Sequence, residues 1–481
     1  MKKTITSMLT LLALCMPALS SAQDYQKYYN QTPVTLNQPQ QVNIPSRSIT
    51  LTEAGGIGDG VTLCTKAIQN AIDKLAQQGG GHLIVPTGVW LTGPIELKDH
   101  IDLHLEKNAI IYFSPDKSIY RDADTKARRV YPCIRAEKRT DIAITGEGII
   151  DGNGAQWRPV KRSKVSDTEW SQFKSMGGQE MKDGTLWYPW QMRNSYPDIA
   201  KSPVAQEQMR NDLVRFEKCK RVLFQGVTFQ NSPRFHVHPC YSSDIIIDGI
   251  TVRCPWNAQN GDGIDLSDCQ RVLVVNSTVN VGDDGICLKS GRPKASAVSG
   301  CEDILVENNT VYHAHGAFVL GSETAAGVRR VVARNCRFAG TDTGLRFKSG
   351  VGRGGETSQL YISNIVMTDI KDEAVVFQCD YVNRPAGASD AKALAPKGDE
   401  AQFVPHFQDI HIDNIICRGA ETAIKAHGIE GMQCVRDINI SNSTFVYSKK
   451  GEDIDTASAS VKLTNVRLLS DKKQQHGIKL Q

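Results

Sequence analysis

The stretch Ile245-Ile-Ile-Asp-Gly249 decides the fold, because its pattern returns along most of the chain. In each copy, β-branched or aliphatic residues alternate with other residues and lead into Gly or Asn, as in Val272-Leu-Val-Val-Asn276 and Ile304-Leu-Val-Glu-Asn308. Alternation with a period of two predicts a β-strand rather than a helix. Gly and Asn tolerate the left-handed backbone that a sharp bend needs. Each copy therefore predicts a short strand followed by a corner.

The copies are spaced like the coils of a solenoid. Between Gly226 and Asn364, successive corner residues are separated by 23 to 32 residues, and periods of this size indicate a stacked array. We predict an all-β, right-handed parallel β-helix whose successive coils stack about 4.8 Å apart. A leucine-rich horseshoe would need regular leucine spacing and a helix in each repeat, and the sequence has neither. The copies occupy residues 142–146, 222–226, 245–249, 272–276, 304–308, 331–335, 360–364, 410–414, 438–442 and 461–465.

One amphipathic segment precedes the repeats. Thr65 to Gln78 places apolar residues on one helical face, and Gly79-Gly-Gly81 follows it. Such a segment predicts a helix, and the open end of a solenoid needs a cap. We therefore expect an N-terminal capping helix. The apolar residues of its face are Ile68, Ala71, Ile72 and Leu75.

The remaining segments define the expected domain organisation. A single catalytic β-helix domain is predicted over residues 49–470. Two polar stretches interrupt its repeats, and insertions in a solenoid emerge as loops, often over the binding face. The first stretch contains four of the six tryptophans, whose rings could either stack on sugars or pack a small core of the insertion itself; they are Trp157, Trp170, Trp187 and Trp190. The segments around and within the domain are an N-terminal extension (23–48), an inserted loop region (155–212), a long loop (383–405) and a C-terminal tail (471–481).

The first residues have the pattern of an export signal. Lys2 and Lys3 precede the short apolar run from Met8 to Leu14, and Ser20-Ser-Ala22 supplies small residues. This order predicts a secretory signal peptide over residues 1–22, with cleavage directly after it. The apolar run is too short to span a bilayer. We expect an exported protein, either periplasmic or secreted, that does not bind a membrane.

Composition argues against some classes of partner and cofactor. The chain has 56 basic and 52 acidic residues, a nearly neutral balance that does not indicate nucleic-acid binding. Of its 13 cysteines none forms a C-x-x-C pair, so a zinc ribbon or redox motif is not indicated. We expect most cysteines to be small, buried core residues. The sequence implies no metal or organic cofactor, and a monomer is expected.

Residues 257–350 carry the groups that can do chemistry. They contain Asn260-Gly-Asp262, Gly282-Asp-Asp284, His315-Gly316 and Arg346-Phe-Lys348. Counted from Asp262 through Asp283 and His315 to Arg346, the intervals are 21, 32 and 31 residues, each about one coil. We expect these groups to form a column on one face, with steps of about 4.8 Å. Arg346 and Lys348, two apart on a strand, should point the same way.

Three carboxylates beside two cations suit acid–base hydrolysis. Carboxylates that lie close together repel in their charged forms, so at least one pKa should rise and provide a general acid, while an ionised neighbour activates water. Inverting hydrolysis of a glycosidic bond uses such a pair about 6.5–9.5 Å apart, a separation that neighbouring coils can provide. A Ca²⁺ site is the alternative use of clustered carboxylates, and the cations of Arg346 and Lys348 count against it. Each motif alone would suit a turn or a packed side chain, but their occurrence in successive coils favours a catalytic site.

The combination of motifs resembles the polygalacturonase family, glycoside hydrolase family 28. Members carry Asn-x-Asp, Gly-Asp-Asp, Gly-His-Gly and Arg-x-Lys in this order, and residues 260–348 are similar in order and spacing. The stretches Gly58-Asp-Gly-Val-Thr62 and Leu91-Thr-Gly-Pro94 are also similar to the family. The resemblance extends over about residues 50–450. It implies an inverting hydrolase of α-1,4-galacturonosidic bonds, which acts on an acidic pectic polysaccharide or oligogalacturonide.

The resemblance implies catalytic roles for the matching acidic residues. Asp283 would be the general acid that protonates the leaving oxygen. Asp262 and Asp284 would hold and deprotonate the attacking water. His315 would tune the acid through a hydrogen bond, and Asn260 would orient the water or Asp262.

The resemblance also implies residues that bind the substrate. Arg346 and Lys348 would bind a galacturonate carboxylate just beyond the cleaved bond, which Arg can do with two parallel hydrogen bonds. Tyr381 is the nearest match to a tyrosine that the family often has one coil past this pair. His238 falls where the family lines its cleft, and Gly316 belongs to the histidine motif.

The chain departs from the family pattern at three places. Ala314 replaces the usual glycine before His315, and Gly261 stands where threonine is common. The 155–212 insertion is large, and in this family extra loops that block the cleft accompany attack at chain ends. The resemblance therefore favours exo action.

Three other functions are compatible with the sequence. A hydrolase of the same family that acts on rhamnogalacturonan or a substituted galacturonan would keep the same motifs. A pectate lyase also uses a β-helix and acidic sugars, but it would need Ca²⁺ and would form an unsaturated product. A glycan-binding solenoid, such as a tailspike-like adhesin, would need no acid–base pair.

Overall fold

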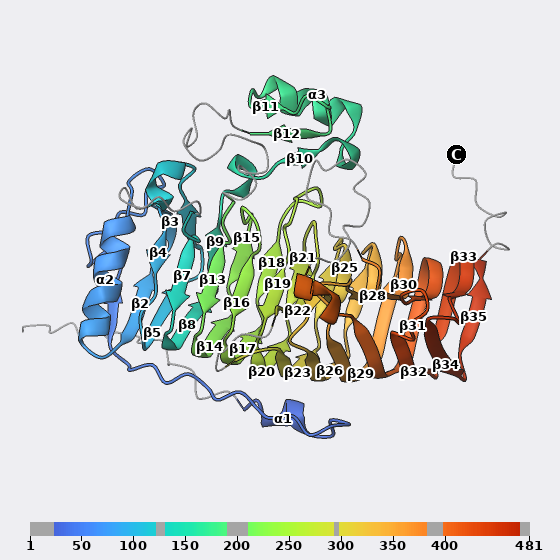
Figure 1. Cartoon of the computed structure of the whole chain (residues 1–481). Coiled ribbons are helices and arrows are strands. Elements are labelled where there is room, and N and C mark those ends of the chain that lie inside the picture. The colour runs from blue at the N-terminus through green and yellow to red at the C-terminus, as the bar shows by residue number, and fades with distance from the viewer. Residues whose placement is uncertain (1–23, 122–129, 190–209, 293–297, 382–397, 472–481) are drawn as a thin grey trace, which may run out of the picture.

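The chain winds into one continuous solenoid (Figure 1), which the computed structural model describes for residues 24–121, 130–189, 210–292, 298–381 and 398–471. Thirty-two of its strands form a single sheet whose pairings between coils are parallel. The coils are right-handed, the hand that nearly all parallel crossovers adopt. The predicted fold class, a parallel β-helix, is confirmed.

Three stacks of strands form the wall of the solenoid, because each coil contributes a short strand to each stack. The first stack consists of β4 (Ile95–Glu96), β7 (Ile134–Glu137), β13 (Val214–Glu217), β16 (Val237–Cys240), β19 (Ile264–Ser267), β22 (Ile286–Ser290), β25 (Gly316–Thr324), β28 (Thr343–Lys348) and β30 (Glu373–Gln378). The second stack consists of β1 (Ser48–Thr50), β2 (Gly81–Val85), β5 (Ile101–Leu105), β8 (Thr140–Gly146), β14 (Lys220–Gln225), β17 (Ser243–Asp248), β20 (Gln270–Val275), β23 (Cys301–Glu307), β26 (Val328–Arg334), β29 (Glu356–Thr368), β31 (His406–His427), β32 (Val435–Ser441) and β34 (Ala459–Thr464). The third stack consists of β3 (Gly88–Thr92), β6 (Ala109–Phe113), β9 (Ile149–Asp151), β15 (Thr228–Gln230), β18 (Thr251–Arg253), β21 (Thr278–Asn280), β24 (Thr310–Tyr312), β27 (Arg337–Ala339), β33 (Thr444–Ile454) and β35 (Arg467–Ser470). The long strands β29 and β31 continue from the second stack into the third.

The interior of the solenoid is apolar, and equivalent residues of successive coils pack on one another. The rings of Phe347 and Phe377, for example, stack with centroids 4.4 Å apart. Helix α2 (Thr65–Gln77) covers the N-terminal end (Figure 1), and its buried residues are the four that the sequence places on one face. Each fully buried aliphatic side chain contributes about 1.5–3 kcal/mol. The predicted capping helix is therefore present and packs by its predicted face.

The predicted corners after the second-stack strands adopt a left-handed backbone. Asn276 and Asn308 both have φ of 56°, and Gly249 has φ of 65°. The asparagines also form a ladder, since the side chain of Asn308 donates to that of Asn276 at 2.7 Å, and Asn414 donates to Asn364 at 2.8 Å. The corner residues thus stabilise both the bend and the stacking of coils.

A second ladder, which the sequence pattern did not reveal, lies near the start of the second-stack strands. Aspartate and arginine alternate there from coil to coil, each with a left-handed backbone. Arg271 donates two hydrogen bonds to the buried Asp244, at 2.7 and 2.9 Å. These pairs join consecutive coils by charge as well as by backbone bonds. The alternating residues are Asp141, Arg221, Asp244, Arg271, Asp303 and Arg330.

Residues 24–47 lie along the outside of the second stack as a strap, which includes the short helix α1 (Gln26–Tyr29) (Figure 1). Tyr25 and Leu36 are buried against outward-facing apolar residues of the stack, among them Leu273 and Leu305. The strap therefore covers an apolar stripe that the coils would otherwise expose to water.

The strap is also bound by the aspartates of the second ladder. The backbone N–H of Asn43 donates to Asp141 at 2.9 Å, and that of Gln40 donates to Asp244 at 3.2 Å. Three residues before Gln40 in the chain, the side chain of Asn37 donates to Asp303 at 2.8 Å. Three residues of extended chain span about 10 Å, which matches two coils of about 4.8 Å each. The strap and the ladder thus have the same repeat length.

The inserted region stands beside the solenoid with a fold of its own (Figure 1). Helix α3 (Asp167–Ser175) begins at a capping box, in which Ser166 and Glu169 bond each other's backbone N–H groups. A small antiparallel sheet lies next to it, formed by β10 (Val160–Lys161), β12 (Leu186–Tyr188) and β11 (Gln179–Glu180). The short 3₁₀ helices in the described residues are η1 (Lys117–Tyr120), η2 (Gly154–Gln156), η3 (Arg162–Lys164) and η5 (Gly398–Gln402).

The tryptophans of the insertion are structural. Trp170 and Trp187 are buried in a small core with Val160 and Val165. Trp157 is buried elsewhere, in the main core. The interpretation that the rings pack a small core of the insertion is therefore right for Trp170 and Trp187, whereas Trp157 packs in the main core. Sugar stacking is wrong for these three buried rings. Trp190 lies outside the described residues.

The described cysteines behave as the sequence suggests. All twelve of those after the predicted signal peptide are buried and unpaired. They therefore serve as small apolar residues of the wall and core.

Some predicted segments lie wholly or largely outside the described residues, namely the signal peptide (1–22), most of the long loop (383–405) and the tail apart from Asp471. Within the described ranges, no helix has the length and apolar character needed to cross a membrane.

Candidate active site

The predicted acidic residues lie in the turns that lead into β19 and β22, and His315 directly precedes β25. The strands that follow pair in register, with Ile264 opposite Ile286. Asp262 and Asp284 each lie two residues before these partners, so they occupy the same position on adjacent coils. Asp283 and His315 form a second pair beside the first, and the His315 N–H donates to the Asp283 carbonyl at 3.0 Å. The expected single column is therefore wrong in detail. Two adjacent columns replace it, because the motifs do not all occupy the same position of their coils.

The three carboxylates lie closer together than expected. One oxygen from each of Asp262, Asp283 and Asp284 lies within 4.8 Å of the others. These oxygens are closer than the expected separation of about 6.5–9.5 Å. The reason is that Asp283 and Asp284 follow each other directly, and Asp262 lies one coil away. Oxygens at this spacing can both accept a hydrogen bond from one water, about 2.7–2.8 Å from each.

Two of these carboxylates present an oxygen without a partner. Oδ1 of Asp262 and Oδ1 of Asp284 are buried and accept no hydrogen bond from the described residues. A buried acceptor without a donor is costly. Both oxygens are therefore suited to accept from a group that is not part of the chain, such as a water.

The predicted cations face the same group. Lys348 Nζ lies 2.7 Å from Asp284 Oδ2, and Arg346 Nη1 lies 3.6 Å from Asp284 Oδ1. The two residues point to the same side of β28, as predicted for positions two apart. They place two positive charges directly beside the carboxylates.

A third cation, Lys289, was not predicted. Its ammonium lies 3.0 Å from Asp265, 3.4 Å from Asp262 and 3.9 Å from Asp284. Burial lowers its pKa, but the charges of Asp265 and its neighbours outweigh burial and raise the pKa well above the ordinary value. Lys289 is therefore a permanent charge that holds three aspartates of adjacent coils together.

The pKa values of the carboxylates differ from the predicted order. Burial and the charges of Asp265 and Asp283 raise the pKa of Asp262 well above its ordinary value. Burial also acts on Asp283, but its hydrogen bond with His315 and nearby positive charges hold the pKa of Asp283 below the ordinary range. The pKa of Asp284 is lowered in the same way, since Lys348 and Lys289 outweigh burial. One carboxyl of the group has a raised pKa, as predicted, but it is Asp262 and not Asp283.

Donors surround Asp283. The backbone N–H of Asn260 lies 3.2 Å from one oxygen, and that of Asp284 lies 3.0 Å from the other. Nδ1 of His315 lies 3.3 Å from this second oxygen. Asn260 thus contacts Asp283 through its backbone, whereas the proposed orientation of Asp262 or water would need its side chain. That side-chain oxygen accepts a hydrogen bond from Arg210 at 2.8 Å.

The insertion reaches into this group. Lys164 Nζ lies 3.1 Å from Nε2 of His315 and 3.1 Å from the carbonyl oxygen of Gly282. Arg210, at the other end of the insertion, donates to the carbonyl of Gln259 at 2.6 Å. Both ends of the inserted region are therefore bonded to the residues that flank the carboxylates.

Comparison with known proteins agrees with this arrangement. The family profile described as "Glycosyl hydrolases family 28" matches residues 184–395. A probable polygalacturonase of Vitis vinifera is 28% identical over 454 residues, which cover 89% of this chain and 82% of that protein. An exo-poly-alpha-D-galacturonosidase of Dickeya chrysanthemi is 29% identical over 417 residues, which cover 83% of this chain and 66% of that protein. The chain is thus similar to the polygalacturonases of glycosyl hydrolases family 28.

The three-dimensional comparison supports the same assignment. The crystal structure of a hyperthermoactive exopolygalacturonase from Thermotoga maritima superposes with a TM-score of 0.69 at 27% identity, over 90% of this chain and 94% of that one. The family profile and these relatives show that the protein is a glycoside hydrolase. The group of three carboxylates is therefore its candidate hydrolytic site.

His238 of this hydrolase lies on the outer face of β16, one coil before β19. Its Nδ1 lies 2.8 Å from the buried Asp212, and its Nε2 lies 3.0 Å from Ser267 Oγ and 3.2 Å from Cys240 Sγ. Burial disfavours the charged ring, but Cys240 and Asp212 raise the pKa of His238 to about 10. The imidazole is therefore a cation near neutral pH.

Tyr381 and Gly316, the remaining predicted residues, are both near the cations of this hydrolase. The Tyr381 ring centroid is 5.2 Å from Lys348 Nζ and 5.9 Å from the Arg346 guanidinium carbon. Gly316 has its carbonyl engaged by the Gly285 N–H at 2.8 Å. A Cβ on Gly316 would lie 2.5 Å from Val319 and 3.2 Å from the Arg346 side chain. We interpret Gly316 as a packing requirement rather than a direct ligand.

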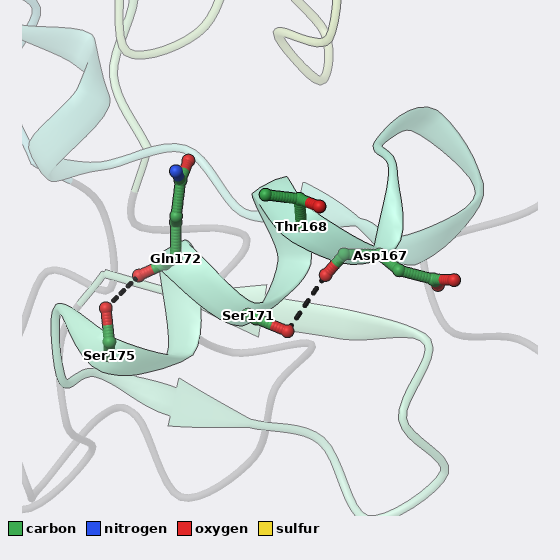
Figure 2. A pocket seen from close by; sticks show the side chains of 5 residues that line it. All are labelled: Asp167, Thr168, Ser171, Gln172 and Ser175. Atoms are coloured by element: carbon green, nitrogen blue, oxygen red, sulfur yellow. Dashed lines mark hydrogen bonds between the residues drawn. The ribbon is translucent and has the colours of Figure 1, made fainter.

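A shallow pocket shown in Figure 2 lies on α3, away from the carboxylates. Its two serine hydroxyls are already used, since Ser171 donates to the Asp167 carbonyl at 2.9 Å and Ser175 donates to the Gln172 carbonyl at 2.7 Å. The pocket contains none of the residues that bind or surround the carboxylates, so it adds nothing to the hydrolytic site.

The carboxylate group is poorly suited to a metal cation. Carboxylates within 4.8 Å of one another are the kind of oxygens that Ca²⁺ prefers. The ammonium of Lys348 is 2.7 Å from Asp284, however, and that of Lys289 is 3.4 Å from Asp262. A divalent cation would have to displace or adjoin these charges, which would repel it.

Proposed function

We propose that the protein hydrolyses α-1,4-galacturonosidic bonds of acidic pectic polysaccharide. The observation that carries the proposal is the group formed by Asp262, Asp283 and Asp284 with Arg346 and Lys348 beside it. The carboxylates supply an acid and a base, and the two cations select a sugar that carries a negative charge. The names of the relatives, a probable polygalacturonase and an exo-poly-alpha-D-galacturonosidase, support the same substrate.

In this proposal Asp283 protonates the leaving oxygen, and Asp262 and Asp284 hold the attacking water. The free oxygens of the latter two residues support the water site. In the substrate-free site the shared proton resides on Asp262, whose pKa is raised. A galacturonate carboxylate bound by Arg346 and Lys348 would cancel the positive charge that now lowers the pKa of Asp283. The proton then transfers within the group to Asp283, since titrations in such a group are coupled.

His315 and Asn260 would support the acid. His315 Nδ1 and the Asn260 N–H both lie within 3.3 Å of Asp283 oxygens. These contacts fix the orientation of the Asp283 carboxyl group. A hydrogen bond to the charged form of this group lowers its pKa. His238 and Tyr381 would bind the sugars on either side, one as a cation and one through its ring.

The insertion favours exo action. Lys164 and Arg210 bond residues on the same side of the carboxylates, where they contact Gly282 and Gln259. The inserted region therefore adjoins the turns that carry Asp262, Asp283 and His315 on three successive coils. The Arg346 and Lys348 pair lies on the coil after these. A chain end would fit this arrangement, and the interior of a long polymer would collide with the insertion.

Specific observations distinguish this proposal from three alternative functions. A pectate lyase needs Ca²⁺, and the lysines beside the carboxylates oppose a cation. A non-catalytic glycan-binding solenoid needs no buried group of three carboxylates. A rhamnogalacturonan or substituted-galacturonan hydrolase would use the same residues, since Arg346 and Lys348 bind only one of the two sugars at the cleaved bond.

The proposal is tested by incubating the protein with polygalacturonate and with rhamnogalacturonan, in the presence of a chelator. We expect reducing ends from polygalacturonate, monogalacturonate as the early product, and no increase in ultraviolet absorbance. In Asp283→Asn, kcat should fall about 10²–10⁴-fold while oligogalacturonate still binds. Turnover by this variant at the wild-type rate would refute the catalytic role. Release from rhamnogalacturonan alone would keep the mechanism and change the substrate.

We also propose that the protein is exported. The predicted signal peptide, residues 1–22, supports this localisation. Sequencing the N-terminus of the protein recovered from periplasm or medium should give Gln23 as the first residue. An N-terminus that still begins at Met1 in those fractions would contradict the predicted cleavage.

A further inference from the structure

The insertion carries a side chain that contacts the hydrolytic site and belongs to none of its motifs. Lys164, the last residue of η3, is half-buried. Its ammonium is 3.1 Å from Nε2 of His315, a residue 151 positions further along the chain. It also donates to the carbonyl oxygen of Gly282 at 3.1 Å. Lys164 is therefore bonded both to His315 and to the residue that precedes Asp283.

The chemistry of the two partners determines which way the hydrogen bond runs. A lysine ammonium has three donors and no acceptor, and a neutral imidazole has one nitrogen of each kind. Nε2 of His315 must therefore accept from Lys164, which leaves the ring proton on Nδ1. Nδ1 is the nitrogen that faces Asp283, at 3.3 Å. The partner of one ring nitrogen thus decides what the other nitrogen can offer.

The other charged group near Nε2 would favour the opposite tautomer. Asp342 Oδ2 is 3.7 Å from Nε2 and would accept a proton from it. This distance is beyond hydrogen-bond range, and Lys371 already binds the Asp342 carboxylate at 2.8 Å. Among the described groups, Lys164 therefore makes the shorter contact with Nε2. This contact favours the tautomer in which Nε2 accepts and Nδ1 carries the proton.

The backbone around Lys164 is anchored, which a positioning role requires. Arg162 donates its backbone N–H to Thr185 at 2.9 Å and a side-chain N–H to the Val165 carbonyl at 2.8 Å. Val165 is buried in the small core of the insertion with Trp170. The tryptophan core thus holds the turn that presents Lys164 to the site.

We propose that Lys164 is a positioning residue that keeps the proton of His315 on Nδ1 and so directs an N–H donor at Asp283. The proposal rests on the proposed function, in which Asp283 is the acid. It gives the insertion a second task besides covering one side of the site. The inserted region completes the hydrogen-bond chain from Lys164 through His315 to Asp283.

The tautomer can be measured without any activity. In protein labelled with ¹⁵N-histidine, the His315 ring signals are those that disappear in His315→Gln. At neutral pH the wild-type protein should show a protonated Nδ1 and an unprotonated, hydrogen-bonded Nε2. A wild-type ring with its proton on Nε2 would overturn the proposal, whatever the enzyme's substrate proves to be. In Lys164→Met the ring should become a mixture of tautomers.

Kinetics separate positioning from substrate binding. Lys164→Met should lower kcat about 10- to 100-fold, the cost of losing a residue that orients a functional group, and leave KM nearly unchanged. Lys164→Arg keeps an N–H donor and should recover most of the loss. Lys174→Met, on α3 of the same insertion, is the matched control, because the only ion pair of its ammonium among the described residues is with Glu180, at 3.8 Å. This variant should match the wild type.

A double variant completes the test. Lys164→Met combined with His315→Gln should be no slower than His315→Gln alone, because Lys164 acts through His315. Losses that multiply, or a raised KM with unchanged kcat, would assign Lys164 to substrate binding and overturn the positioning role. If the wild-type protein released nothing from galacturonan, the proposed function would fail, while the ring signals would still decide the tautomer.

Discussion

At the scale of single residues, the site depends on how charge is distributed over three carboxylates. Asp262 has its pKa raised, chiefly by burial, while Asp283 and Asp284 have lowered pKa values. The difference arises from unequal neighbours. His315 forms a hydrogen bond with Asp283 and Lys348 directly contacts Asp284, whereas the charges of Asp265 and Asp283 add to burial at Asp262. Under the proposed function, the protonation state of the three carboxylates depends on whether a negatively charged sugar has bound.

The role of Arg346 predicts a charge-dependent defect. Arg346→Ala should lower kcat/KM for oligogalacturonate by about 10²-fold or more, the effect of losing a charged hydrogen-bond partner worth about 3 kcal/mol. The loss for a neutral analogue, with its carboxylates esterified, should be much smaller. Initial rates with the two substrates measure the ratio. Equal losses for both would contradict a carboxylate-binding role.

The buried pair of His238 and Asp212 predicts a pH-dependent stability. The pKa of His238 is raised to about 10, so its contribution is complete below the unfolded pKa of about 6.5 and is lost as pH rises toward 10. The pKa of Asp212 is lowered, because His238 and nearby arginines outweigh burial. Its contribution is therefore present above the unfolded pKa of about 3.9 and is lost as pH falls.

Asp212→Asn should accordingly lower the free energy of unfolding by about 3 kcal/mol, most strongly between about pH 4 and 6.5. Urea titrations across the pH range measure the difference from wild type. Glu137→Gln is the control, because it removes an exposed pair with Lys138, and it should change stability by less than about 0.5 kcal/mol. A pH-independent difference for Asp212→Asn would refute the assigned charge of His238.

The sequence predicted those site residues whose motifs recur at coil spacing. Asp262, Asp283 and His315 were found because residues one coil apart along the chain lie close in space. Lys164 and Arg210 were missed, because they come from an insertion that carries no repeat. The pKa order was also missed, since Lys289 lies in an ordinary strand and no motif marks it.

At the scale of elements, two ladders hold the coils in register. The asparagine ladder was predictable in position, since the corner residue ends each repeat. The alternating aspartate and arginine ladder was not, because its residues vary in type from coil to coil and only their spacing is regular. The strap was predicted as a segment, but its path depends on aspartates far away in sequence, such as Asp141 and Asp303.

The second ladder makes a stability prediction. Arg271→Ala would leave Asp244 buried without its bidentate partner, so the free energy of unfolding should fall by about 3–5 kcal/mol. Arg329→Ala is the matched control, since its pair with Glu302 is exposed, with 59% of the Arg329 side chain accessible, and it should cost less than about 1 kcal/mol. Urea titration of both variants decides the matter, and equal losses would show that the ladder carries no special stability.

The insertion shows why its tryptophans could not be assigned from sequence. Aromatic residues on a loop fit both sugar stacking and local packing, and composition does not separate them. In the structure Trp170 and Trp187 pack together beside Val165. In the role proposed for Lys164 they contribute indirectly, because their core holds the turn that ends at Lys164.

At the scale of the whole molecule, the solenoid converts distances along the sequence into positions on one face. Asp262 and Arg346 are far apart in the chain, yet both lie against Asp284 because the first-stack strands stack in register. The repeat and its period were sufficient to predict this architecture. The three-dimensional relation of the insertion to the site was not, because it depends on side-chain contacts between segments without a shared period.

The measurement that tests the central claim most directly is an NMR time course of polygalacturonate hydrolysis with a chelator present. We predict monogalacturonate from the first minutes, with its β anomer appearing before mutarotation produces the α anomer, and no unsaturated product. The β anomer follows if water attacks opposite the leaving group of an α linkage. Early α anomer would contradict the assignment of Asp262 and Asp284 to a water, and an unsaturated product or no product at all would contradict the hydrolysis of galacturonan itself.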